Sequence, residues 1–86
     1  MLNVTKTENF NNVKNQFIIT TKDGIYLQSY NSIIAFKSRD GKIYLDNYYW
    51  DYSTTTGKYR NLFLNETKKD TEQKIKDGIY ILTNLN

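Results

Sequence analysis

The chain of 86 residues contains no cysteine, no histidine and no proline. Without cysteine it can form neither a disulfide nor a thiolate metal site, and without histidine it lacks the commonest general base at neutral pH. These absences exclude Ser-His-Asp and Cys-His catalysis and the usual zinc sites. We therefore predict no catalytic residues, no metal and no cofactor, and we rank enzymatic activity last among the candidate functions.

The chain also lacks a long apolar run. The N-terminal sequence MLNVTKTENF does not have the apolar centre of a secretion signal, and no segment approaches the roughly 20 apolar residues that span a bilayer. The net charge of +3 is modest, and no block of like charge occurs. We expect a soluble cytoplasmic protein that accepts an anionic partner without requiring one.

The strand signals come from runs rich in Ile, Tyr and Phe that are separated by Asp-Gly pairs, which favour tight hairpin turns. Four strands are predicted as an antiparallel meander, at 17–21, 25–30, 32–37 and 42–47. The Asn-rich opening, residues 1–14, is predicted to be a polar arm or a short irregular element. The length fits a single domain over residues 1–86.

Two helices are predicted between the meander and a last strand at 79–85. The charged segment 68–76 has Thr67 as its N-cap, and Gly78 ends it. An earlier helix, between 50 and 65, has Ser53, Thr54 or Thr55 as its N-cap and a stripe of Tyr59, Leu62 and Phe63 that packs on the sheet. The predicted fold class is α+β: an antiparallel sheet of four to five strands, with both helices on one face.

The segment WDYSTTTGKYRN, residues 50–61, is the candidate ligand-binding site. Hydroxyls and free amides at a helix N-terminus can donate to an anion, two cations add charge, and aromatic rings can stack on a base or sugar. The candidate ligand-binding residues are Trp50, Tyr52, Ser53, Thr55, Thr56, Lys58, Tyr59 and Arg60.

A purely structural explanation of this segment has about equal weight. The same hydroxyls can cap the helix, Trp50 and Tyr59 can fill the core, and the two cations can be solvated. Three consecutive threonines exceed what one cap uses, which is the local reason to favour a site. Asp46 and Asp51 could hold Mg²⁺ if they met, but stabilising turns is the more frequent role of such residues.

Eight tyrosines form the second feature of the sequence. Strand alternation and the Gly turns predict one sheet face that carries Tyr26, Tyr30, Tyr44 and Tyr80. An exposed aromatic face with nearby cations is typical of proteins that bind single-stranded nucleic acid. Alternatively, these rings cover the core and keep their hydroxyls in water.

A longer pattern then becomes informative, namely W-D-Y-S-x-T-T-x-K-x-R-N-x-F-L at 50–64, with LQSYNSIIAF at 27–36 and KIKDGIYILTNLN at 74–86. It resembles small uncharacterised proteins of phages and other bacterial mobile elements, which form a domain of unknown function. The resemblance implies a compact non-enzymatic protein in the host cytoplasm that inhibits a host process, such as an anti-phage defence system.

Two routes to inhibition remain open at this stage: sequestering an anionic nucleotide, or occluding a host protein. Charge and the hydroxyl-rich helix start favour the nucleotide slightly. A small nucleic-acid-binding regulatory or accessory protein is the alternative. We expect no membrane partner, and a homo-oligomer that pairs along a strand edge or across a helix.

Overall fold

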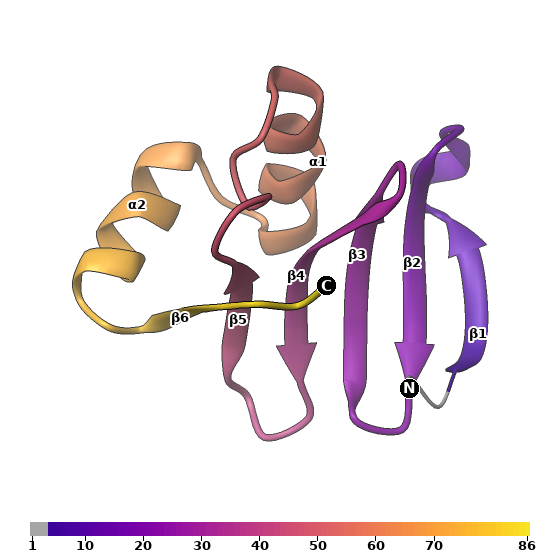
Figure 1. The fold of residues 1–86 in the computed structure, drawn as a ribbon, viewed down its shortest axis with the longest axis horizontal. Helices are drawn as coiled ribbons and strands as arrows, with labels where there is room; N and C mark the ends of the chain where they lie inside the picture. The colour runs from indigo at the N-terminus through magenta and orange to yellow at the C-terminus, as the bar shows by residue number, and fades with distance from the viewer. Residues whose placement is uncertain (1–3) are drawn as a thin grey trace.

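The structure is a computed structural model that describes residues 4–86, and it has one six-stranded sheet and two α-helices (Figure 1). The strands are β1 (Val4–Asn9), β2 (Gln16–Thr21), β3 (Gly24–Ser29), β4 (Ser32–Ser38), β5 (Ile43–Asp46) and β6 (Tyr80–Thr83). The helices are α1 (Thr54–Leu64), α2 (Lys68–Lys76) and the short 3₁₀ turn η1 (Phe10–Asn12). The α+β class is confirmed, but the sheet has six strands instead of four to five.

Strands β2 to β5 form the predicted antiparallel meander and lie side by side in chain order. The first hairpin turns at Lys22 and Asp23, and Gly24 already pairs with Thr21. Gly24 has a φ of +149°, and a Cβ there would overlap the backbone oxygen of Lys37 on β4. Glycine is therefore required at this position by the close approach of β4 as well as by its backbone conformation.

The N-terminal segment is ordered as a strand and a turn, which corrects the prediction of an irregular arm for residues 4–12. β1 pairs with β2 although every β1 residue is exposed. In η1, the Phe10 ring meets Tyr59 and Phe63 of α1 edge-on, at centroid distances of 6.1 and 6.5 Å. Phe10 thus packs against the helix. Residues 1–3 of the predicted arm lie outside the described residues.

The last strand, β6, pairs with β5 in parallel, where an antiparallel sheet was predicted. Both helices lie between β5 and β6 in the chain, and such a crossover lets the second strand run in the same direction as the first. α1 packs on β3 and β4, while α2 packs beside β6 at the end of the sheet (Figure 1). Among residues 4–86, no helix has the length and apolar character needed to cross a membrane.

The core lies between the sheet and α1, and its buried members are Leu27, Ile34, Ala35, Leu45, Phe63 and Tyr80. The buried stripe of α1 includes Tyr59 and Phe63 as predicted, but Leu62 is 48% exposed. Arg60 takes the inward position instead, because it lies three residues before Phe63 and four after the buried Thr56.

The predicted tyrosine face is only partly correct. Tyr26 and Tyr44 lie on one face, where both stack against Phe36. Tyr80 is buried on the opposite face, where its hydroxyl donates to Glu66. Tyr30 lies in the β3–β4 turn. A positive φ at Tyr30 and a bulge in the β3–β4 pairing break the regular alternation that the prediction assumed.

Candidate ligand-binding site

The start of α1 is capped by Ser53, whose Oγ accepts a hydrogen bond from the Thr56 amide at 3.1 Å. Thr56 is itself buried, and its hydroxyl lies 3.4 Å from Ser29 Oγ on β3. Two of the predicted site residues thus have structural contacts that fasten α1 to the sheet. Thr54 and Thr55 between them are exposed.

Arg60 is enclosed by the protein, with 1% of its surface exposed. It donates to the Trp50 carbonyl at 2.8 Å, to Asp51 Oδ1 at 3.0 Å and to Asn61 Oδ1 at 3.0 Å. Its guanidinium also lies 5.1 Å from the centroid of the half-buried Trp50 ring. Arg60 therefore fixes the loop before α1 onto the helix, and it is not the solvated cation that the structural explanation assumed.

Asp51 joins Arg60 to the second helix, because its other oxygen accepts from Lys68 Nζ of α2 at 2.7 Å. Partial burial works to raise the pKa of Asp51. The hydrogen bonds and charges of Lys68 and Arg60 outweigh it and hold that pKa below its usual value. Asp51 thus stays ionised at neutral pH and ties α1, α2 and the preceding loop together.

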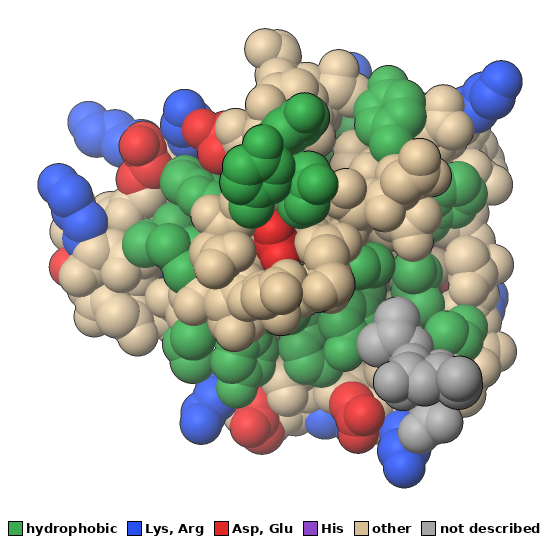
Figure 2. Space-filling model, in the orientation of Figure 1, with side chains coloured by type: hydrophobic (Ala, Val, Ile, Leu, Met, Phe, Trp, Pro, Cys, Tyr) green, Lys and Arg blue, Asp and Glu red, His purple; other side chains and the backbone are tan. Residues whose placement is uncertain are grey.

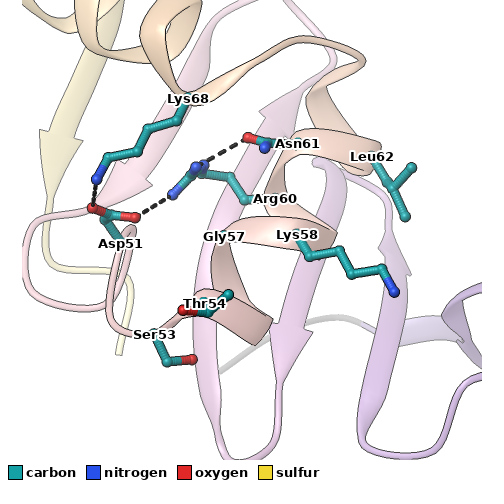
Figure 3. A pocket seen from close by; sticks show the side chains of 9 residues that line it. All are labelled: Asp51, Ser53, Thr54, Gly57, Lys58, Arg60, Asn61, Leu62 and Lys68. Atoms are coloured by element: carbon teal, nitrogen blue, oxygen red, sulfur yellow. Dashed lines mark hydrogen bonds and ion pairs between the residues drawn. The ribbon is translucent and has the colours of Figure 1, made fainter.

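The two cations of the predicted site do not converge. Lys58 is exposed, and Figure 3 shows its side chain pointing away from Arg60 and from the Ser53 hydroxyl. Its ammonium lies 5.5 Å from the centroid of the Tyr59 ring. Tyr59 is buried in the core, with 8% of its surface exposed, so its ring face is not available for stacking on a ligand.

A groove of about 740 Å³ nevertheless runs along α1. It is lined by Asp51, Ser53, Thr54, Gly57, Lys58, Arg60, Asn61, Leu62 and Lys68 (Figure 3). We call it the helix groove. Gly57 lies in its floor, and a Cβ at that position would be 3.5 Å from Arg60 Nη2, an ordinary contact distance. Lys68 was missed from the sequence because it comes from the other helix, and no local pattern indicates that contact.

A second cavity, of about 330 Å³, lies on the other side of the α1 N-terminus. We call it the tyrosine pocket, and it is lined by Ser29, Tyr30, Asn31, Ser32, Ile34, Tyr49, Tyr52, Ser53 and Thr56. None of the described residues that line it carries a charge at neutral pH. Tyr52, Ser53 and Thr56 belong to the predicted set, whereas Tyr30 and Tyr49 were missed. Ser53 lines both cavities.

Tyr30 has an unusual backbone conformation. Its φ is +56°, its amide donates to the Asn15 carbonyl at 2.7 Å, and 53% of its surface is exposed. Bulky residues seldom adopt positive φ, and residues held in such conformations cluster at functional sites. This φ belongs to the two-residue turn between Ser29 and Ser32, where tight hairpins require positive φ, and the turn places the Tyr30 ring beside the pocket.

Opposite Tyr30, three tyrosines cluster in the loop between β5 and α1. Tyr48 and Tyr52 are 67% and 61% exposed, and each lies within 6 Å of the half-buried Tyr49 ring, at centroid distances of 4.7 and 5.3 Å. Figure 2 shows hydrophobic side chains gathered over this loop. The segment therefore exposes more aromatic surface than packing requires.

Asp46, the last residue of β5, holds this loop in place. The buried carboxylate accepts from the amides of Tyr48 and Tyr49 at 3.1 and 2.8 Å and from the amide of Leu85 at 2.8 Å. Asp46 and Asp51 thus have separate partners, and each has the turn-stabilising role that was the more frequent expectation. Among residues 4–86, no cluster of three or more potential metal ligands occurs.

Fold and site together define a small α+β domain with two adjoining cavities at the start of its first helix. The chain belongs to a family that is described only as a family of unknown function (DUF8033), which matches residues 2–78. No curated protein and no solved structure matches the chain. The family match covers all the lining residues of both cavities but assigns them no role.

Proposed function

We propose that this chain is a non-enzymatic binding protein encoded by a phage or another mobile element, and that it inhibits a host defence system by occluding a host protein. The contact surface in this proposal is the tyrosine pocket with the exposed Tyr48 beside it. The origin and the inhibitory role follow the sequence resemblance. The choice of surface follows the geometry at the α1 N-terminus.

The observation that carries the proposal is the group of exposed tyrosines around an uncharged pocket. Tyrosine is enriched among the residues that dominate binding energy in protein interfaces, because it adds a large contact area and a hydroxyl with few rotatable bonds. Tyr30, Tyr48 and Tyr52 are each more than half exposed. Nothing in the pocket lining supplies the charged acid or base that a reaction would use.

Sequestration of an anionic nucleotide is the second candidate, and the helix groove supports it. Lys58 and Lys68 add positive charge to that groove, and Ser53 connects it to the tyrosine pocket. A base in the pocket and phosphates in the groove would use both cavities. This route ranks second because the guanidinium of Arg60 is already paired with Asp51.

Capture from lysates of bacterial hosts, followed by titration of the purified captured protein, tests the first route. We expect Tyr52→Ala to weaken binding about 30-fold or more, as for a residue that contributes ~2 kcal/mol. Leu62→Ala is the matched control, because Leu62 is 48% exposed on the other side of α1. Unchanged affinity in Tyr52→Ala would refute the assignment of this surface.

A thermal-shift panel of nucleotides, including cyclic and ADP-ribose types, tests the second route. A shift that Lys58→Met abolishes would transfer the proposal to nucleotide sequestration. Absence of any shift would remove that route and leave the first. For the nucleic-acid alternative, a mobility shift with single-stranded DNA or RNA that fades steeply as salt rises is the expected signature.

A further inference from the structure

A third cavity, of about 260 Å³, lies at the end of the sheet where β2 and β4 finish and β3 begins. It is lined by residues 20–21, 24–25 and 37–39, and we call it the sheet-end cavity. Figure 1 shows the β2–β3 turn beside it and the β3–β4 turn beside the tyrosine pocket at opposite ends of the sheet. The sheet-end cavity shares no lining residue with the tyrosine pocket or with the helix groove.

Two cations and no carboxylate belong to the lining of this cavity. The cations are Lys37 and Arg39, and none of the lining residues is an Asp or a Glu. Among the ion pairs of residues 4–86, none includes either cation. Asp23 and Asp40 lie in the two flanking turns, and Asp40 accepts from the Lys42 amide. The cavity therefore carries two positive charges without a paired counter-charge.

Lys37 is half-buried beside α1. Its ammonium donates to the Phe63 carbonyl in the last turn of that helix and lies 4.4 Å from the centroid of the Phe63 ring. Loss of hydration lowers the pKa of Lys37 below its usual value. The end of a helix offers only about half of a negative charge, and this bond uses one of the three N–H donors of the ammonium. An anion beside Lys37 would complete the compensation of its charge.

Arg39 is the second and independent observation, because it has no comparable structural role. It is exposed, and its guanidinium donates to the Thr21 carbonyl at the long distance of 3.4 Å. That contact keeps the side chain at the cavity, since Thr21 is also a lining residue. A guanidinium has five N–H donors in a fork that matches the oxygens of a phosphate or a carboxylate. Most of the fork is therefore available to a ligand.

The size of the cavity and its hydroxyls restrict the ligand further. A volume of about 260 Å³ lies below the ~300–1,000 Å³ of sites that take drug-sized molecules, so the cavity suits a compact group. Three hydroxyls belong to the lining. That of Thr21 already donates to a backbone carbonyl, and that of Ser38 bonds the Asp40 carboxylate. The Thr20 hydroxyl is left as a further donor beside the two cations.

We propose that the sheet-end cavity binds a compact oxyanion, a phosphate or carboxylate group, through Lys37 and Arg39. Lys37 supplies charge from the half-buried side, and Arg39 bonds the oxygens from the exposed side. The site goes beyond the proposed function, because the tyrosine pocket at the other end of β3 and β4 stays open to a host protein. It also differs from the nucleotide route, in which the phosphates would lie in the helix groove.

Amide NMR titration of the full chain with sodium phosphate and with sodium acetate tests the proposal. Sodium chloride at matched ionic strength is the reference, because it screens charge without offering an oxyanion. We expect saturable shifts at residues 20–25 and 37–39, and none at 29–32 or 53–60. Saturation by phosphate would identify a phosphate group as the ligand, and saturation by acetate would identify a carboxylate. Either result supports the site.

Arg39→Gln is the variant to measure first, because Arg39 is exposed and its backbone bond to Asp23 is kept. We expect it to weaken the affinity about 10-fold or more, as for the loss of a charge-assisted hydrogen bond. Lys22→Gln is the matched control, since it removes the same charge from an exposed position in the neighbouring turn, outside the lining. It should change the affinity by less than about 2-fold. Circular dichroism verifies that both variants are folded.

Three results would overturn the proposal. The first is a set of shifts that do not saturate or that chloride produces equally. The second is an unchanged affinity in folded Arg39→Gln, and the third is a set of shifts confined to residues 53–60, which would assign the anion to the helix groove. None of these results affects the capture experiment on the tyrosine pocket, because that experiment depends on different residues.

Discussion

Replacing Arg60 by Met tests whether the guanidinium of this residue stabilises the fold or serves to bind a ligand. The substitution keeps an unbranched side chain of similar length, so the cavity that it leaves is small. It removes the guanidinium that bonds the Trp50 carbonyl, Asp51 and Asn61. Because Arg60 is 1% exposed, these bonds have little competition from water.

The expected loss of stability follows from what is left behind. The Trp50 carbonyl loses its partner, which costs ~1–3 kcal/mol when the group stays buried. Asp51 loses one ionic partner but keeps Lys68 at 2.7 Å, and its side chain is 29% exposed, so this contribution is at the low end for a broken pair. We expect Arg60→Met to lower the free energy of unfolding by about 3 kcal/mol.

Urea titration and thermal unfolding measure this change directly. In a domain of this size each kcal/mol lowers Tm by about 4 to 8 °C, so the shift should be roughly 10 to 25 °C. Lys58→Met is the matched control, because the same replacement two residues earlier in α1 removes an exposed cation. It should change stability by less than about 0.5 kcal/mol.

The result that would refute this reasoning is an Arg60→Met variant as stable as the wild type. Its guanidinium would then contribute nothing net to folding, although it is buried and paired. A loss of stability in Lys58→Met as large as in Arg60→Met would also contradict it. In that case the exposed and the buried cation would have the same role.

Three further predictions concern the fold. Glu66 accepts from Lys74, Thr71 and Tyr80; burial works to raise its pKa, but these bonds outweigh it and keep the pKa below the ordinary 4.5. The stabilisation from ionised Glu66 is therefore complete above pH ~4.5 and is lost as the pH falls through the lower native pKa. Glu66→Gln should lower the free energy of unfolding by about 2 kcal/mol at neutral pH, and the difference from the wild type should shrink when unfolding is measured in acid. Gly24→Ala should lower stability by about 3 kcal/mol in urea unfolding, because of its positive φ and the overlap with β4, and near wild-type stability would show that β4 can move away. Ser53→Ala should lower the free energy of unfolding by about 1 kcal/mol in the same assay. Ser53→Asp should keep most of the wild-type stability, because an aspartate can still cap the helix.

The sheet could be predicted from the sequence where a strand has one buried face. β2 to β5 show the alternation and turn residues that such strands require, and all four lie where they were predicted. β1 shows no such pattern because all of its residues are exposed, and its backbone pairing with β2, with one bond from the Thr5 hydroxyl to the Thr20 carbonyl, holds it in place. The parallel direction of β6 depends on how the two helices cross over, which no local pattern encodes.

The candidate site could be predicted only in part, for a similar reason. Ser53 as a helix cap and Tyr59 as a core residue follow from local rules, and the structure contains both. The inward direction of Arg60 has a local signal, its spacing from Thr56 and Phe63, but the charge of the side chain outweighed that signal in the prediction. Tyr30 and Tyr52 line the same pocket although they are 22 residues apart in the chain. Spacing along the sequence cannot reveal such a contact.

The contacts that remove Arg60 from the ligand-binding set strengthen the case for Tyr52. Asp51 before it is fastened by Arg60 and Lys68, and Ser53 after it is fastened as the N-cap of α1. The exposed ring therefore stands on a backbone that is fixed on both sides. A fixed side chain loses less conformational entropy on binding than one on a mobile loop, which favours affinity. In the proposed function the buried ion pair holds the loop, and the exposed tyrosines on that loop are the groups that would contact the partner.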